Sequence, residues 1–176
     1  LGRAVAEAGF RAILIDGPAH GGSDGRTASM VSFAEGLARA AETFGQPCAL
    51  VAHSMGLPSG VIAMAEHGLK PQAVIGLGAP ASLDENVRFQ GAGMGMRPRT
   101  IALLLEAVAY RLERPVARFT VADDAPGFTA RGLFLHGAGD TIAPSSAAQT
   151  IASAWPGGEA VILDGLGHRG VLRDQR

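Results

Sequence analysis

The chain has 176 residues, of which 47% are hydrophobic, and a formal net charge of −1. This length fits one domain of about 100–200 residues. The near-zero charge gives no electrostatic reason to expect nucleic acid or an anionic membrane surface as a partner. No apolar run is long enough for a transmembrane helix. The single cysteine, Cys48, excludes an internal disulfide, and a reducing, cytoplasmic location is expected. Cys48 begins an apolar run, so we expect its thiol to be buried.

Short apolar runs alternate with amphipathic patterns along the chain, which itself begins inside a helical pattern. The predicted strands are residues 11–16, 48–52, 72–77, 131–136 and 159–163. The predicted helices are residues 28–44, 57–67, 100–112 and 145–155. This alternation is typical of βαβ units. We therefore predict an α/β fold with a mostly parallel sheet and helices on both faces.

Residues 81–130 interrupt the alternation, and they contain one clear helical pattern. A long segment of this kind between two strands is usually a lid or a binding loop. We interpret it as a short helical cap inserted into a single domain that spans residues 1–176. Within it, Met94 and Met96 could bind substrate by lining an adaptable apolar pocket, or they could form a flexible tip.

Three polar residues each follow the end of a predicted strand. In chain order they are Ser54, Asp140 and His168. Open parallel sheets bind ligands at the carboxyl ends of their strands. The order serine, acid, histidine is the order expected of α/β-hydrolases. The sequence therefore predicts a catalytic triad.

Each residue of this triad has a distinct expected role. A serine hydroxyl is a weak nucleophile until a base removes its proton, so His168 is the expected base for Ser54, and Asp140 would orient the imidazole. The helix that starts just after Ser54 would aim the Met55 N–H at the site as an oxyanion donor. Asp164 is the alternative acid, although it precedes His168 by only four residues.

Three further histidines lie near these motifs. His53 precedes the nucleophile, and it either packs locally or contributes to substrate binding. His20 lies in a glycine-rich loop, which it could organise or from which it could contact substrate. His136 ends a predicted strand and is interpreted as structural. No Cys/His/Asp cluster has metal-ligand spacing, so we expect neither a metal nor a cofactor.

At these motifs the chain resembles the α/β-hydrolase superfamily, in particular its capped, bacterial, esterase-like members. The matching segments are residues 15–25 (IDGPAHGGSDG), 51–56 (VAHSMG), 135–144 (LHGAGDTIAP) and 165–172 (GLGHRGVL). The resemblance implies a nucleophile elbow at Ser54, an acid turn at Asp140 and a histidine turn at His168. Leu57 departs from the pattern, because many relatives have a glycine there.

The resemblance also implies elements that these residues do not contain. In the family, a strand carrying a second oxyanion donor would precede residue 1, and a final helix would follow residue 176. We therefore interpret the chain as an internal fragment of a longer hydrolase. Since losing one oxyanion donor typically lowers the rate by about 10²–10³, we expect this chain alone to be weakly active or inactive.

The sequence thus predicts a serine hydrolase that cleaves a carboxylic ester or a related acyl bond of a small molecule. The alternative is a hydrolase-like binding module without catalysis, or a fragment with no function of its own. The triad fixes the mechanism but not the leaving group. Esters, thioesters and amides therefore stay open as substrates, as does the oligomeric state.

Overall fold

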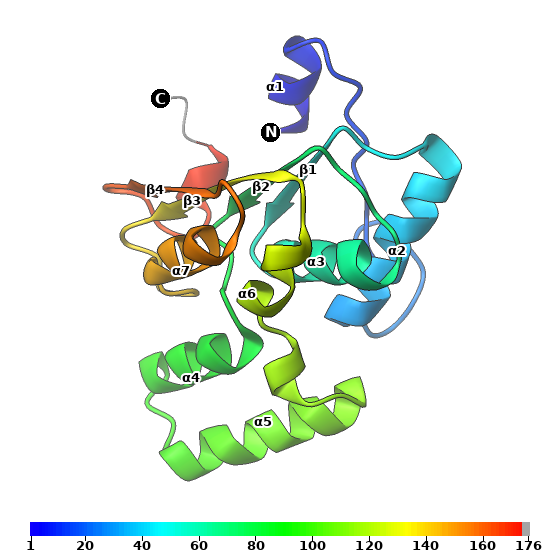
Figure 1. Cartoon of the computed structure of the whole chain (residues 1–176). Helices are drawn as coiled ribbons and strands as arrows, with labels where there is room; N and C mark the ends of the chain where they lie inside the picture. The colour runs from blue at the N-terminus through cyan, green and yellow to red at the C-terminus, as the bar shows by residue number, and fades with distance from the viewer. Residues whose placement is uncertain (174–176) are drawn as a thin grey trace.

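A computed structural model describes residues 1–173 of the chain. Its centre is a four-stranded parallel sheet with the strand order β1-β2-β3-β4 (Figure 1). The strands are β1 (Ala49–His53), β2 (Ala73–Leu77), β3 (Arg131–Gly137) and β4 (Glu159–Leu163). The strand order follows the chain order, so each crossover moves one position along the sheet. The α/β fold class and the parallel sheet are confirmed.

The described helices include the four predicted ones, close to their predicted bounds, and three others. They are α1 (Gly2–Glu7), α2 (Met30–Phe44), α3 (Gly56–Glu66), α4 (Leu83–Gly93), α5 (Pro98–Leu112), α6 (Val121–Asp124) and α7 (Ser146–Ala154), with short 3₁₀ turns at Val116–Arg118, Ala125–Gly127 and Gly170–Leu172. Figure 1 shows α3 and α7 on one side of the sheet and α1 on the other. Along β3, buried residues alternate with half-buried ones, as expected when one face of a strand is more fully covered.

The core between the sheet and these helices is tightly packed. Phe134 of β3, Leu57 of α3 and Ile151 of α7 are almost completely buried, and each contributes about 1.5–3 kcal/mol through burial. Leu57 does not crowd the contact between helix and strand, because Gly76 of β2 lies beneath it. A Cβ added at Gly76 would lie 2.9 Å from both Leu57 Cδ2 and Phe134 Cδ1.

Two predictions from the sequence are wrong. Residues 11–16 form no strand, and Ile13, Leu14 and Ile15 are exposed, Leu14 at 78%. A strand needs a hydrogen-bonded neighbour, and no described segment pairs with these residues or with the free edge of β1. Cys48 is exposed and not buried, because it lies just before β1, at this same free edge.

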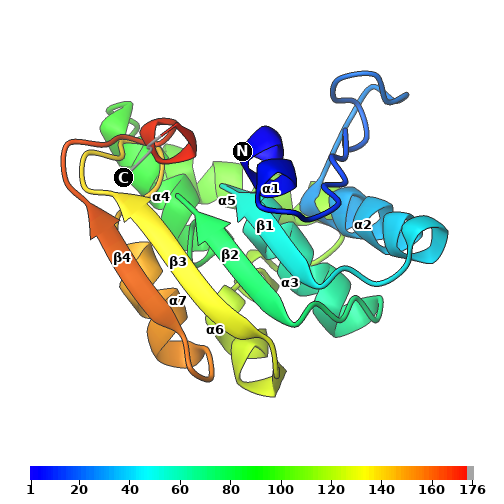
Figure 2. The same ribbon diagram turned by 90° about the horizontal axis from the view of Figure 1, so that it is seen from above.

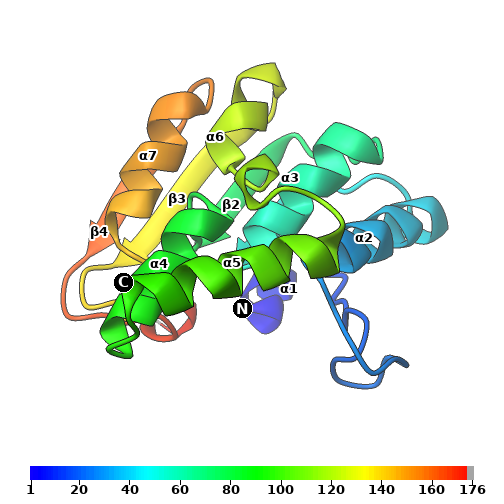
Figure 3. The same cartoon turned by 90° about the horizontal axis from the view of Figure 1, so that it is seen from below.

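The segment 81–130, predicted as a cap, contains α4, α5, α6 and two 3₁₀ turns. The sequence indicated only one of these helices, α5. Figure 3 shows α5 as a long helix that crosses in front of α3 and α2. Ile101 and Leu105 of α5 are buried in an apolar cluster with Met30 of α2 and Ile62 of α3. The segment is thus packed onto the main domain.

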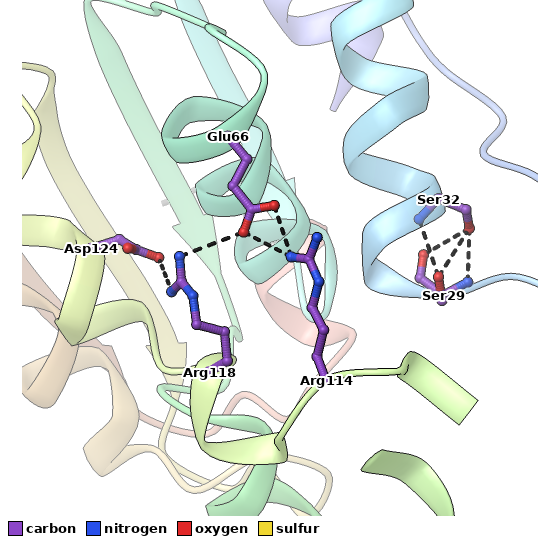
Figure 4. A network of polar contacts seen from close by, with 6 residues as sticks. All are labelled: Ser29, Ser32, Glu66, Arg114, Arg118 and Asp124. Carbon is purple, nitrogen blue, oxygen red and sulfur yellow. Dashed lines mark hydrogen bonds and ion pairs between the residues drawn. The ribbon is translucent and has the colours of Figure 1, made fainter. Parts of the chain in front are cut away.

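Ion pairs also join this segment to α3 (Figure 4). Glu66, at the end of α3, accepts hydrogen bonds from Arg114 at 2.8 Å and lies 3.5 Å from Arg118. Arg118 also donates to Asp124 at 3.0 Å. The same figure shows the capping box of α2, in which the side chains of Ser29 and Ser32 each accept a hydrogen bond from the other's backbone N–H.

Within residues 1–173, no helix combines the length and apolar character needed to cross a bilayer.

Candidate active site

The three predicted catalytic residues all lie at the carboxyl edge of the sheet. Ser54 follows β1 directly, Asp140 follows β3 and His168 follows β4. In Figure 2 the arrowheads of all four strands point to the same edge, where α4 also lies. The parallel strands therefore bring Asp140 and His168 together, although these residues are 28 positions apart in the chain.

Ser54 occupies a strained turn between β1 and α3. Its φ is +55°, in the left-handed region that L-residues rarely adopt. Its N–H donates to Leu77 O at 2.9 Å, and its carbonyl accepts from Leu57 N–H at 3.1 Å. Among the described residues, neither the Ser54 hydroxyl nor the Met55 N–H has a hydrogen-bond partner. Both groups are thus available to a ligand.

Asp140 and His168 form a hydrogen-bonded pair. His168 Nδ1 lies 2.7 Å from Asp140 Oδ2, and the other carboxylate oxygen accepts the N–H groups of Ile142 at 2.7 Å and Ala143 at 3.0 Å. Burial alone would raise the pKa of Asp140. The hydrogen bonds from Ala143, His168 and Ile142 outweigh burial and lower that pKa below its ordinary value. Asp140 is therefore a carboxylate at neutral pH.

His53 supports the loop that carries His168. Its Nε2 lies 3.0 Å from His168 O, and the two rings lie 4.6 Å apart between centroids. Burial and the nearby His168 charge lower the pKa of His53, against the pull of the His168 carbonyl and the Asp140 charge. A neutral His53 thus braces the backbone of the histidine turn, and its contact with substrate stays a prediction.

Glycines allow the loops at this edge to approach one another. Gly78, which follows β2, has a φ of +56°, and a Cβ there would lie 3.3 Å from His168 Nδ1 and 3.4 Å from Asp140 Oδ2. Gly137, at the end of β3, leaves no room for a Cβ, which would lie 2.4 Å from Leu166 O. The hydrogen-bonded pair of Asp140 and His168 therefore depends on glycine at positions 78 and 137, where a side chain would crowd the pair or collide with the neighbouring loop.

A cavity of about 560 Å³ opens beside the turn at Ser54. Its walls come from the start of α2, the start of α3 and the last turns of α5, with His20 from the glycine-rich loop. Most lining residues are apolar, including Met30, Phe33 and Val108, and Arg111 is the charged residue among them. Met55 and Gly56 connect the cavity to the turn at Ser54. Its volume suits a small organic ligand, for which pockets of about 300–1,000 Å³ are usual.

The two methionines predicted to bind substrate are not among the lining residues of this cavity. Met94 is 68% exposed, and Met96 packs against the apolar cluster around Ile101. Their contact with substrate stays a prediction. His20 does line the cavity, while its Nδ1 also bonds to Pro18 O at 2.9 Å. In the described part of the chain, no group of three or more His, Cys, Asp or Glu side chains could hold a metal ion.

Solved structures with the same architecture match most of the chain. The candidate non-heme bromoperoxidase BpoC from Mycobacterium tuberculosis H37Rv aligns with a TM-score of 0.70 and 17% identity, over 98% of this chain and 82% of that one. Rv0554 from M. tuberculosis aligns with a TM-score of 0.72 and 17% identity, over 97% and 77%. The chain has the α/β-hydrolase fold. A scan against protein-family models and a search of curated proteins both find no match.

Another solved structure that matches the chain is Est816, described as an N-acyl homoserine lactone degrading enzyme. It aligns with a TM-score of 0.65 and 16% identity, over 86% of this chain and 73% of that one. At these identities the comparisons establish the fold. The chemistry of this chain has to be argued from its own residues.

Proposed function

We propose that this protein is a serine hydrolase that cleaves a carboxylic ester or a related acyl bond. The observation that carries the proposal is the strained Ser54 turn at the same sheet edge as the hydrogen-bonded pair of Asp140 and His168. A positive φ at a non-glycine residue is costly, and it persists mainly where function requires it. The names of several structures with this fold, among them a thermophilic esterase, support hydrolysis as the class of reaction.

In the proposed reaction, Ser54 Oγ attacks the carbonyl carbon while its proton passes to His168 Nε2. The carbonyl oxygen becomes an oxyanion, which accepts a hydrogen bond from the Met55 N–H. The bond to the leaving group then breaks, and His168 returns the proton to the departing oxygen. Water cleaves the acyl-enzyme by the same steps, and the Asp140 carboxylate stabilises the imidazolium form of His168 in both halves.

The cavity is the proposed site for the acyl group. The leaving group has to lie against His168, because His168 supplies its proton. The cavity is lined by Met55 and Gly56, next to Ser54, and by no residue of the turn that carries His168, so we assign it to the acyl group and not to the leaving group. Its mostly apolar walls favour an apolar acyl group. The substrate is therefore a small apolar ester or acyl compound, and a cytoplasmic location stays our prediction.

The test is covalent labelling of the 176-residue chain with a fluorophosphonate, followed by intact-mass measurement and peptide mapping. We expect one adduct on Ser54, which Ser54→Ala abolishes and His168→Ala strongly slows. An adduct at another residue, or equal labelling of the His168→Ala variant, would contradict the proposal. Absence of any adduct on a folded chain would favour the alternative stated from the sequence, a binding module without catalysis or a fragment with no function of its own.

A further inference from the structure

A second histidine, His136, is buried beside the catalytic carboxylate. It lies near the end of β3, and none of its surface is exposed. Its Nε2 lies 3.0 Å from Asp140 Oδ2 and 3.3 Å from Ala143 O. The same Oδ2 accepts the hydrogen bond from His168 Nδ1 at 2.7 Å. Two imidazoles therefore approach one carboxylate oxygen, and the triad uses only one of them.

The surroundings of His136 determine which ring nitrogen carries the proton. Both atoms near Nε2 are acceptors, so Nε2 must be the donor. Nδ1 is buried and has no partner among the described residues, so a proton there would be left without an acceptor. Burial lowers the pKa of His136, although Asp140 and the Ala143 carbonyl pull in the opposite direction. His136 is thus a neutral imidazole with its proton on Nε2.

A neutral donor at this position fixes the carboxylate without cancelling its charge. The N–H groups of Ile142 and Ala143 hold Oδ1, whereas the side chains that approach Oδ2 within residues 1–173 are the hydrogen-bonded His168 and the imidazole of His136 at 3.0 Å. One of these, His168, is itself the group that the carboxylate has to orient. His136 is anchored in β3, its Nε2 is in hydrogen-bond contact with the Ala143 carbonyl, and the same nitrogen lies 3.0 Å from Oδ2. It therefore ties the loop of residues 140–143 back to the sheet.

We propose that His136 is a positioning residue, whose Nε2–H keeps Asp140 Oδ2 directed at His168. The proposal rests on the proposed function for its effect on rate, but its structural part can be measured separately. Partners that orient a reactive group in this way commonly change activity by about 10–100-fold.

Two amide substitutions at His136 distinguish the effect of the position of the N–H donor from the effect of losing the volume of the ring. In His136→Gln, the amide nitrogen falls where Nε2 was, and its two N–H groups can reach both Oδ2 and Ala143 O. In His136→Asn, the shorter chain places the amide nitrogen near the position of Nδ1, where residues 1–173 offer no hydrogen-bond partner. We expect fluorophosphonate labelling of Ser54 to fall about 10–100-fold in the Asn variant and to stay near the wild-type rate in the Gln variant.

Proton and nitrogen NMR of the unlabelled chain provides a readout that does not depend on activity. We expect a downfield proton signal from the hydrogen bond between His168 Nδ1 and Asp140, retained in His136→Gln and lost or exchange-broadened in His136→Asn. We also expect nitrogen shifts of His136 in the wild type that report a proton on Nε2. A proton on Nδ1, or equal labelling rates and equal downfield signals in both folded variants, would overturn the proposal. If wild-type Ser54 does not label, the proposed function fails, and the NMR measurements still decide the role of His136.

Discussion

Gly78 offers the sharpest test of how the site is assembled. It follows β2, it adopts a φ of +56°, and an added Cβ would lie 3.3 Å from His168 Nδ1 and 3.4 Å from Asp140 Oδ2. Gly78→Ala therefore has two separate effects. The left-handed backbone costs about 1–2 kcal/mol of stability for any L-residue. The methyl group also forces the pair of Asp140 and His168 to move by a few tenths of an ångström.

This displacement should lower the rate of reaction at Ser54. A misplacement of 1 Å can cost about 10²-fold in rate, so we expect a loss of roughly tenfold for this smaller movement. The rate of fluorophosphonate labelling measures the loss, and urea unfolding measures the stability of the same sample. The pair itself, 2.7 Å long in the wild type, can be followed by its downfield proton signal.

Gly157→Ala is the matched control for this experiment. Gly157 has a φ of +65°, and a Cβ there would have nothing within 4 Å. The residue lies in the turn between α7 and β4, so the variant carries the backbone cost alone. We expect both variants to lose about 1–2 kcal/mol of stability and only Gly78→Ala to lose labelling rate. Equal labelling rates in the two variants would refute the steric argument.

Three further predictions concern stability and charge. Ser54→Gly should be more stable than Ser54→Ala by about 1 kcal/mol in urea unfolding, because glycine adopts a φ of +55° without strain. Asp140→Asn should slow labelling by about 10³–10⁴-fold. Folding lowers the pKa of Asp140 from 3.8, so the ionised carboxylate stabilises the folded wild type. The difference in unfolding free energy between wild type and Asp140→Asn should therefore be largest above pH 3.8 and should shrink as the pH falls further and the carboxylate is protonated. Glu66→Gln should lower stability by about 0.5–1 kcal/mol at low salt and less at high salt, because the ion pairs with Arg114 and Arg118 are partly exposed.

The sequence predicted elements well wherever local pattern and tertiary context agree. The strand at residues 159–163 was predicted at the bounds that the structure gives it, and β1, β2 and β3 were placed within a residue at each end. Residues 11–16 have an equally apolar pattern but form no strand, because pairing is a property of two segments and not of one. The exposed Cys48 follows from the same unpaired edge of β1.

Chain order and strand ends located Ser54, Asp140 and His168, and the structure brings the last two within hydrogen-bond distance. The acid turn at Asp140 accounts for that hydrogen bond, so the alternative acid, Asp164, is not needed for it. The role of His136 could not be predicted in this way. A histidine in an apolar strand indicates a buried structural residue, and its contact with Asp140, four positions later, exists only because the turn folds back on the strand. The cavity was equally hidden, since its walls come from segments that are distant in sequence.

Leu57 illustrates why a departure from a familiar pattern need not signal lost function. A larger residue after the nucleophile turn would push α3 away from the sheet if the strand beneath it carried a side chain. Here the strand has Gly76, whose missing Cβ leaves the space that Leu57 Cδ2 and Phe134 Cδ1 occupy. Leu57 is completely buried, and its side chain fills the space above Gly76. The close packing of α3 on the sheet, next to the strained turn at Ser54, therefore depends on Leu57 and Gly76 together, and neither residue alone indicates it.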